Sequence, residues 1–398
     1  MLAVTPVEPG TFFAIIAASA VAGTISALAG ERGIVLPVVV IELVFGVLLG
    51  PQVAGLHVTS FITFISDLGL GLLFFFAGYE IDLRAIRGEP LRLGMLGWAL
   101  SLAIAYTVGG ALAAAGVVLS LLYTGSALAT TAVGMLVPIL SDVGEMRTRF
   151  GTHVLAAGAV GELGPILLIT LALSAQSTLH NALILVLFVL LAVVVAVFAV
   201  RSSERAVPLF ERTLEHSSQL AVRWILVLVF ALALLAFELG LDLLLGGFAA
   251  GLITRQALQA HELPGFDTKL TAVAFGVFVP FFFVVSGMNL NVEALFSSWG
   301  SIAKMVLFLG LFLVVRGVPA LLLYRRVLDG RERAALAFMS STQLPLVIAI
   351  TTLATSTGHM RSSTAAALVA AAVLSTLMFP MLALRLRRER VTEAIAVA

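Results

Sequence analysis

Long apolar runs separated by short polar links dominate the chain from one end to the other. A helix needs about 20 apolar residues to cross the hydrocarbon core of a bilayer. The runs are too long for barrel strands and lack a two-residue alternation. They predict an all-α polytopic membrane protein of thirteen transmembrane helices, near residues 11–30, 34–50, 58–79, 91–116, 117–140, 151–175, 180–200, 218–238, 241–254, 269–288, 299–324, 332–356 and 361–384.

Composition excludes several classes of protein. Of the 398 residues, 61% are hydrophobic and 11% are charged, which a water-soluble domain would not tolerate on its surface. The chain has no cysteine, so it can form neither a disulfide nor a thiolate metal site. A net charge of +1 argues against a nucleic-acid partner. No pattern indicates a cofactor or an intramembrane enzyme, and we expect neither.

Basic residues indicate the orientation in the membrane. Most of the 23 lysines and arginines fall in the links after predicted helices 1, 3, 5, 7, 9 and 11 and in the C-terminal tail, whereas the opposite links hold only Arg361. The positive-inside rule then places the N-terminus outside and the C-terminus in the cytoplasm. We expect a multi-pass protein of the plasma or inner membrane.

The two halves of the chain share glycine patterns. "FGVLLGP" around Gly46 resembles "GGFAAGL" around Gly247, and "FFAGYEIDL" around Gly78 resembles "VVSGMNLNV" around Gly287. Both pairs link segments seven helices apart, an odd number, so a second copy would be inverted, as in many secondary transporters. Close helix packing is the alternative explanation for such glycines. The pattern predicts two inverted six-helix repeats joined by a linker helix: 11–175, 180–200 and 218–387.

Two predicted helices at corresponding positions in these repeats carry polar side chains near the middle of the membrane, where lipid disfavours them. In each, polar side chains stand mid-span before a proline: Thr130 and Thr131 before Pro138, and Ser341, Thr342 and Gln343 before Pro345. Proline removes a backbone donor, and hydroxyl groups can satisfy the carbonyls and amides that a break frees. A simple kink, with hydroxyls bonded to their own helix, is the alternative for either helix alone. The matching positions favour a pair of crossed discontinuous helices.

A carboxylate follows the first of these helices, in "VLAAGAVGELGPILLITLAL", residues 154–173. A charge at the bilayer centre costs at least about 2.5–3.5 kcal/mol, so an intramembrane acid suggests function. A buried carboxyl kept neutral by a neighbour is the alternative reading of Glu162. Among other acids, Asp67 lies near a helix end and Glu42 is more central. Glu162 is favoured because Gly161 and Gly164 let other backbone approach it.

Several motifs, taken together, cover nearly the whole chain and resemble the membrane domain of the monovalent cation:proton antiporter-2 family. This family belongs to the sodium/proton exchanger superfamily, which includes the glutathione-gated potassium efflux systems. The motif at 127–168, "ALATTAVGMLVPILSDVGEMRTRFGTHVLAAGAVGELGPILL", is the most specific. Others are "ISDLGLGLLFFFAGYEIDLRAIR" at 65–87, "ELGLDLLLGGFAAGLI" at 238–253 and "FVPFFFVVSGMNLNVEAL" at 278–295.

The resemblance implies roles for particular residues. It places Thr130 and Thr131 in an unwound crossing segment and makes Glu162 the group that binds proton and cation alternately. Relatives are usually homodimers. Two departures stand out: relatives commonly carry Asp-Asp, Asn-Asp or Gln-Asp where this chain has Gly161-Glu162, and electrogenic relatives carry a lysine in helix 10, where this chain has no base. Arg316 in helix 11 is interpreted as a structural partner for a helix terminus or for Glu42, with an ion-pathway role as the alternative.

The resulting hypothesis is antiport of K+ or Na+ against H+ by alternating access, electroneutral because a single carboxylate carries either substrate. Oxygen ligands suit a hard cation, and the partners are protons, monovalent cations and membrane lipid. A proton-driven exporter of a small organic solute on the same fold and a non-transporting membrane sensor remain as alternatives. The expected ion-binding residues share a position at the crossing: Thr130, Thr131, Gly161, Glu162, Ser341, Thr342 and Gln343.

Overall fold

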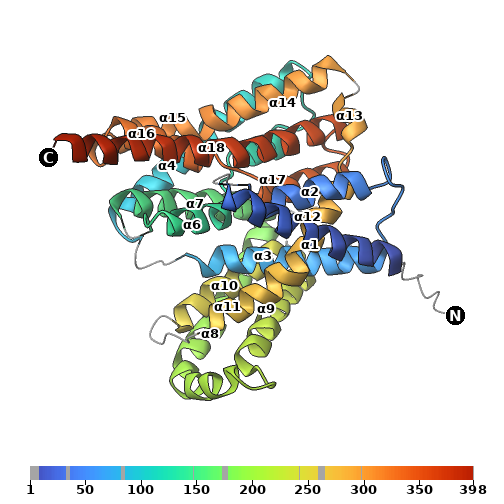
Figure 1. The fold of residues 1–398 in the computed structure, drawn as a ribbon, viewed down its shortest axis with the longest axis vertical. Coiled ribbons are helices and arrows are strands. Elements are labelled where there is room, and N and C mark those ends of the chain that lie inside the picture. The colour runs from blue at the N-terminus through green and yellow to red at the C-terminus, as the bar shows by residue number, and fades with distance from the viewer. Residues whose placement is uncertain are drawn as a thin grey trace. The chain divides into compact units, whose positions relative to one another are not determined.

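A computed structural model of the chain describes residues 9–32, 36–81, 86–146, 148–172, 178–241, 243–258, 265–296 and 298–397 (Figure 1). Within these ranges the secondary structure is helical and contains no strand, which confirms the predicted all-α class. Ten described helices are long and apolar enough to cross a membrane. Three shorter apolar helical segments, Val38–Leu49, Leu121–Val137 and Leu243–Leu258, complete the set.

Each of the thirteen predicted ranges overlaps one of these segments, although how many cross the bilayer stays a prediction. Two helices continue beyond their predicted ends. The linker helix predicted at 180–200 lies in a helix that extends to Leu214, and the last helix continues to Val397. Helical propensity persists through both polar extensions, where hydropathy no longer marks a span. Residue 175, the predicted end of the first repeat, lies outside the described residues.

The chain forms two compact units, each built from separate stretches of sequence. The first unit comprises Met1–Ile34, Val38–Asp82 and Ile166–Asn289, and the second comprises Val35–Pro37, Leu83–Pro165 and Leu290–Ala398. Each unit therefore draws helices from both of the predicted repeats. The inverted symmetry of those repeats stays a prediction.

Glycines bring the helices of the first unit into close contact. A Cβ atom at Gly46 on α2 would collide with the Val284 carbonyl on α12, and one at Gly251 on α10 would collide with the Phe75 carbonyl on α3. The glycines that suggested a repeat thus serve helix packing. The unit contains α1 (Pro9–Glu31), α2 (Val38–Leu49), α3 (Ser60–Tyr79), α8 (Thr178–Leu214), α9 (Leu220–Glu238), α10 (Leu243–Leu258), α11 (Phe266–Val273), the π-helical turn η1 (Ala274–Phe278) and α12 (Val279–Met288).

The second unit packs around a core of buried side chains that includes Leu136, Phe150, Tyr324 and Met339. Within it, α18 packs against both α14 and α16 (Figure 1). Its helices are α4 (Glu89–Ala114), α5 (Leu121–Leu128), α6 (Val133–Asp142), most of α7 (Arg149–Ala172), α13 (Val292–Phe296), α14 (Trp299–Phe312), η2 (Leu313–Gly317), α15 (Val318–Leu323), η3 (Tyr324–Arg326), α16 (Gly330–Ser340), α17 (Pro345–Ser356) and α18 (Ser362–Val397).

Both predicted helix breaks are confirmed in the second unit. Helix is interrupted between Leu128 and Val133, and again between Ser340 and Pro345. Pro345 stands at the second break and begins α17, as its missing N–H predicts. Pro138, by contrast, lies inside α6, so it does not cause the first break. There the backbone instead forms hydrogen bonds with other segments.

Candidate ion site at the helix breaks

Glu162 lies on α7 and is 3% exposed. Its Oε2 atom accepts a hydrogen bond from the backbone N–H of Val133 at 3.0 Å. Val133 is the first residue of α6, whose first amides have no partner within the helix and carry partial positive charge. The carboxylate therefore sits at the electropositive end of a helix that begins inside the protein.

Backbone hydrogen bonds join both breaks to each other and to α7. The N–H of Thr131 donates to the Gly161 carbonyl at 3.0 Å, and the N–H of Ala132 donates to the Thr342 carbonyl at 2.9 Å. These bonds replace the helical bonds that the first break loses. The backbone at Thr131, Gly161 and Thr342 is thus brought together, and Gly161 directly precedes Glu162 on α7.

Gln343 spans the two breaks with its side-chain amide. Its Oε1 atom lies 2.9 Å from the Thr130 hydroxyl, and its Nε2 atom donates to the Leu128 carbonyl at 3.2 Å. The hydroxyls of Ser375 and Thr376 on α18 each donate to the Gln343 carbonyl at 3.1 Å. Gln343 therefore satisfies the orphan carbonyl at the end of α5 and holds Thr130 beside it.

Ser341 and Thr342 use their hydroxyls differently. The Ser341 hydroxyl donates to the Ala337 carbonyl at 2.6 Å, and the Thr342 hydroxyl donates to the Phe338 carbonyl at 3.3 Å. Both bonds satisfy the end of their own helix, α16, as in the kink alternative. Thr342 contributes to the crossing through its carbonyl.

Arg316, on the π-helical turn η2, is 4% exposed. Its Nε atom donates to the Thr131 hydroxyl at 2.9 Å and lies 3.4 Å from the carbonyl of Ser340, the last residue of α16. Its two terminal nitrogens donate to the Ser101 hydroxyl at 3.2 Å and to the Ala157 carbonyl at 3.0 Å. These contacts favour the interpretation of Arg316 as the partner of a helix terminus.

The guanidinium of Arg316 also explains the glycine at position 161. A Cβ atom there would collide with Nη2 of Arg316 and would lie 2.8 Å from the Thr131 hydroxyl. The guanidinium of Arg316 occupies the space that a side chain at position 161 would need. Gly161 and Arg316 therefore form a matched pair, which accounts in packing terms for the missing second acid.

The other candidate acids belong to the first unit. Asp67 is exposed on α3. Glu42 on α2 is 2% exposed, and its Oε1 atom accepts a hydrogen bond from the Ser19 hydroxyl at 2.9 Å. Glu42 belongs to the first unit and Arg316 to the second, so the alternative pairing of these two residues stays a prediction.

Sequence reasoning missed several residues that hold the site. Trp98 on α4 donates its indole N–H to the Ala129 carbonyl at 3.2 Å, and its ring fills the space beside Gly164. Ser101 on α4 accepts from Arg316. Adjacent hydroxyls at Ser375 and Thr376 within an apolar run were a signal that could have been used, whereas nothing local distinguishes Trp98 from a lipid-facing aromatic.

Comparisons with known proteins agree with this architecture. The family model described as "Sodium/hydrogen exchanger, transmembrane" matches residues 15–384. The Na(+)/H(+)-K(+) antiporter GerN of Bacillus cereus is 29% identical, over 89% of this chain and 91% of the relative. The probable Na(+)/H(+) antiporter 3 of Methanocaldococcus jannaschii is 26% identical, over 66% and 68%.

A solved structure shows a similar fold. It is that of the sodium proton antiporter MjNhaP1 from Methanocaldococcus jannaschii at pH 8, with a TM-score of 0.64 and 16% sequence identity, covering 94% of this chain and 98% of that chain. The family match and the fold together confirm the predicted resemblance to the sodium/proton exchanger superfamily.

Proposed function

Because the chain belongs to the sodium/hydrogen exchanger transmembrane family, we propose that it exchanges a monovalent cation, Na+ or K+, for protons across a membrane. One relative, GerN, is named as an antiporter of both cations. The observation that carries the proposal is the placement of Glu162, a single buried carboxylate where two interrupted helices and α7 meet. Such sites at discontinuous helices bind coupling ions in secondary transporters.

Glu162 is the alternating carrier in this proposal. A bare carboxylate in the bilayer is costly, so it crosses with a proton or with a cation bound. Between loads, the Val133 N–H and the positive end of α6 stabilise its negative charge. The Thr130 hydroxyl and carbonyls of the two breaks supply the oxygen ligands that hard cations prefer. The Thr131 hydroxyl accepts from Arg316 and donates to the Ser340 carbonyl, so its oxygen keeps one lone pair for a cation.

The charge balance of the site supports electroneutral exchange. Arginine keeps its proton in proteins, so Arg316 contributes one positive charge in every step. Glu162 is then the group whose charge changes, and its proton-loaded and cation-loaded forms carry equal charge. Alternating access with this site moves one proton for one monovalent cation.

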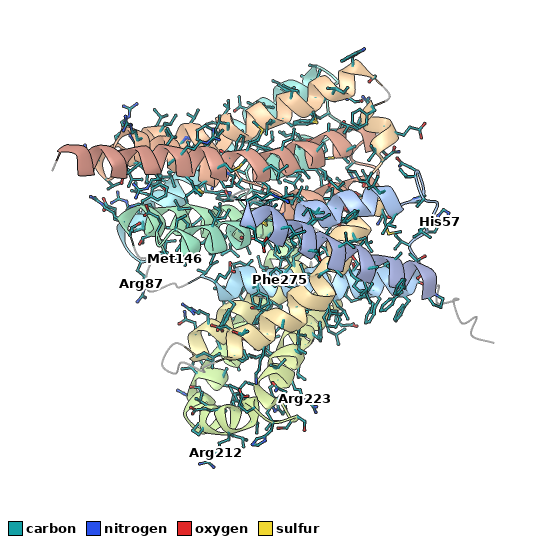
Figure 2. The ribbon with its side chains drawn as sticks, viewed as in Figure 1. His57, Arg87, Met146, Arg212, Arg223 and Phe275 are labelled. Carbon is teal, nitrogen blue, oxygen red and sulfur yellow. The ribbon has the colours of Figure 1, made fainter. Side chains whose placement is uncertain are left out.

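Orientation and assembly follow from sequence and resemblance. In the first unit, Arg212 and Arg223 flank the turn that joins α8 to α9 (Figure 2). In the second unit, Arg87 lies in the turn that precedes α4 (Figure 2). Basic residues at these links favour a cytoplasmic position. We therefore place the N-terminus outside and the C-terminus in the cytoplasm of the plasma or inner membrane, and the resemblance favours a homodimer.

Reconstitution tests the function directly. Purified protein in proteoliposomes with an internal pH dye is given pulses of NaCl, KCl, LiCl or choline chloride under an imposed pH gradient. Proton movement with an alkali chloride but not with choline chloride, lost in Glu162→Gln, supports cation antiport. Proton movement that an organic solute drives without alkali cations would identify the exporter instead. No movement with any salt in folded protein would favour a sensor.

A further inference from the structure

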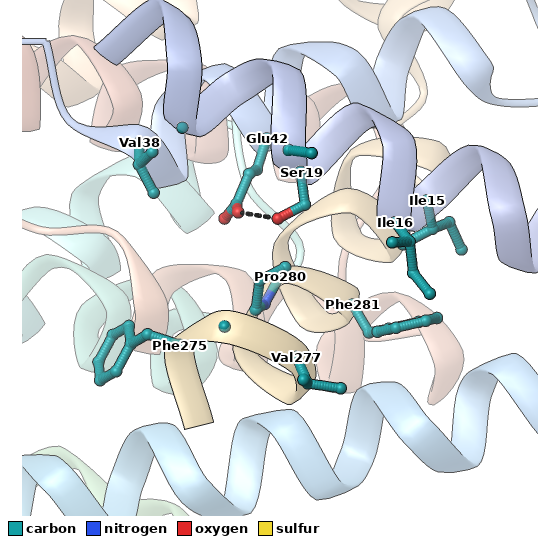
Figure 3. A pocket seen from close by; sticks show the side chains of 12 residues that line it. Ile15, Ile16, Ser19, Val38, Glu42, Phe275, Val277, Pro280 and Phe281 are labelled. Atoms are coloured by element: carbon teal, nitrogen blue, oxygen red, sulfur yellow. Dashed lines mark hydrogen bonds between the residues drawn. The ribbon is translucent and has the colours of Figure 1, made fainter. Parts of the chain in front are cut away.

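A cavity of about 340 Å³ lies within the first unit, and the proposed exchange cycle does not use it. Helices α1 and α2 form one side of it, and η1 with the start of α12 forms the other (Figure 3). Its volume falls in the range of pockets that bind small molecules. Among its lining residues, Glu42 and Ser19 supply the polar side chains.

Glu42 is the charged group of this cavity. It is 2% exposed, and the Ser19 hydroxyl donates to one of its oxygens at 2.9 Å (Figure 3). An ionised carboxylate offers about four acceptor sites, and one hydroxyl occupies only one of them. A buried charge is costly unless a counter-charge pairs with it. The described residues form no salt bridge with Glu42, so a cationic donor bound in the cavity would compensate the charge of the ionised carboxylate.

The opposite wall includes a backbone carbonyl, that of Phe275, without its regular helical partner. Residues Ala274–Phe278 form a π-helical turn, in which the N–H of Val279 bonds to the Ala274 carbonyl. The next bond of this series would run from residue 280 to the Phe275 carbonyl, but Pro280 has no N–H. Phe275 and Pro280 both line the cavity. Irregular turns of this kind are frequent at functional sites.

The remaining wall is apolar. Ile15, Ile16, Val38, Val277 and Phe281 line it together with small residues of α1. A small alkali ion would interact with the Glu42 end and leave these side chains without a partner. A molecule that carries both a positive donor and an apolar body would satisfy the whole cavity, because its body buries apolar surface while its head pairs with the carboxylate.

We propose that this cavity is a binding site for a small organic ammonium ion, that is, a protonated amine with an apolar body. The ammonium group donates to Glu42, and the body packs against Ile15 and Phe281. The residues that line the cavity belong to the first unit, whereas Glu162 belongs to the second. The proposal does not depend on the exchange activity.

Equilibrium binding to the purified full chain in nanodiscs tests the site. The probe is 2-phenylethylammonium, compared with 2-phenylethanol, which has a similar shape without the charge, and with tetramethylammonium, which has the charge without the body. We expect saturable binding of the amine, weaker by roughly tenfold or more for both comparison molecules, since each lacks one half of the interaction.

Variants assign the binding to the cavity. Glu42→Gln is expected to weaken amine binding by about tenfold or more, because it removes the charge that pairs with the ammonium group. Ser19→Ala should weaken it by a smaller factor, because it keeps the carboxylate and removes only the hydroxyl that donates to it. Gly23→Leu should weaken it by filling the cavity, since a Cβ atom at Gly23 meets nothing within 4 Å. Because Gly23→Leu leaves Glu42 intact, it keeps the test decisive if Glu42→Gln does not fold.

Matched controls define what would overturn the proposal. Glu162→Gln should leave amine binding unchanged, as should Gly110→Ala, a change at a helical glycine of the second unit with open space around it. Equal binding of amine and alcohol would mean an unselective apolar cavity and would reject the ammonium site. Loss of amine binding in Glu162→Gln would place the amine at the cation site, and unchanged binding in both Glu42→Gln and Gly23→Leu would exclude this cavity.

Discussion

The carboxylate of Glu162 and the backbone N–H of Val133 lie 3.0 Å apart, so a side chain of α7 caps the first turn of α6. A helix that begins within the protein has amides that need acceptors, and here the acceptor is the group proposed to carry protons and cations. Each loading of Glu162 therefore alters the end of a helix, which couples the chemistry of the site to the backbone around it.

Removing the charge of Glu162 separates its transport role from its capping role. In Glu162→Gln the amide oxygen can still accept from Val133, so we expect a folded protein in which cation and proton movement are both abolished. Glu162→Asp should keep some exchange with an altered pH dependence. The measurement is proton flux in proteoliposomes, with thermal unfolding as the check on folding. Wild-type flux in the glutamine variant would reject the assignment, and Glu42→Gln should reduce flux less.

The pairing of Gly161 with Arg316 predicts a steric coupling. Gly161→Ala places a methyl group against the guanidinium and the Thr131 hydroxyl, and overpacking of this kind costs about 1–3 kcal/mol. We expect a lower unfolding temperature and slower exchange. Gly310→Ala is the matched control, because a Cβ atom there meets nothing within 4 Å and alanine favours helix.

A double-mutant cycle shows whether Arg316 is the cause. Combining Gly161→Ala with Arg316→Ala removes the group that the methyl displaces, so the two losses of stability should not add. Additive losses would mean that the cost of Gly161→Ala arises elsewhere in the site.

The two threonines of the first break should respond differently. Thr130 contacts Gln343 and Thr131 contacts Arg316. Thr130→Val is expected to weaken apparent cation affinity more than stability. Thr131→Val removes the nearer acceptor of Arg316 Nε and leaves it the Ser340 carbonyl at 3.4 Å. A poorly satisfied buried donor costs up to about 1–3 kcal/mol, so this variant should lower stability as well. Salt titrations of flux and thermal unfolding measure the two effects, and equal losses in affinity and stability for both variants would favour a purely structural role.

Electroneutral exchange predicts insensitivity to voltage. Membrane potential acts with about 2.3 kcal/mol per charge per 100 mV, so a cycle that moves no net charge should not respond to it. Proteoliposomes loaded with the transported cation receive a potential from an ionophore for a different ion, and internal pH is followed. A rate or end point of exchange that shifts with the potential would mean that a second group takes up or releases protons in each cycle. That result would reject the single-carboxylate mechanism.

The sequence by itself determined the class, the apolar segments and the acid to consider. Insertion in lipid depends on hydropathy summed over about 20 consecutive residues, a local property, and so every predicted run overlaps a described helix. The second break could also be predicted, because Pro345 has no backbone N–H to donate to a preceding helix. Glu162 was identifiable because any carboxylate within such a run is costly.

Only the tertiary structure decided what these residues do to one another. The first break is held by bonds from Thr131 to Gly161 and from Ala132 to Thr342, and no local motif specifies partners so far apart in the chain. In the sequence, Gly161 stands where relatives have a second ligand, whereas in the structure the guanidinium of Arg316 fills the space beside it. Hydropathy selects segments one at a time, whereas hydrogen bonds and steric fit depend on which segments meet, and packing alone sets that.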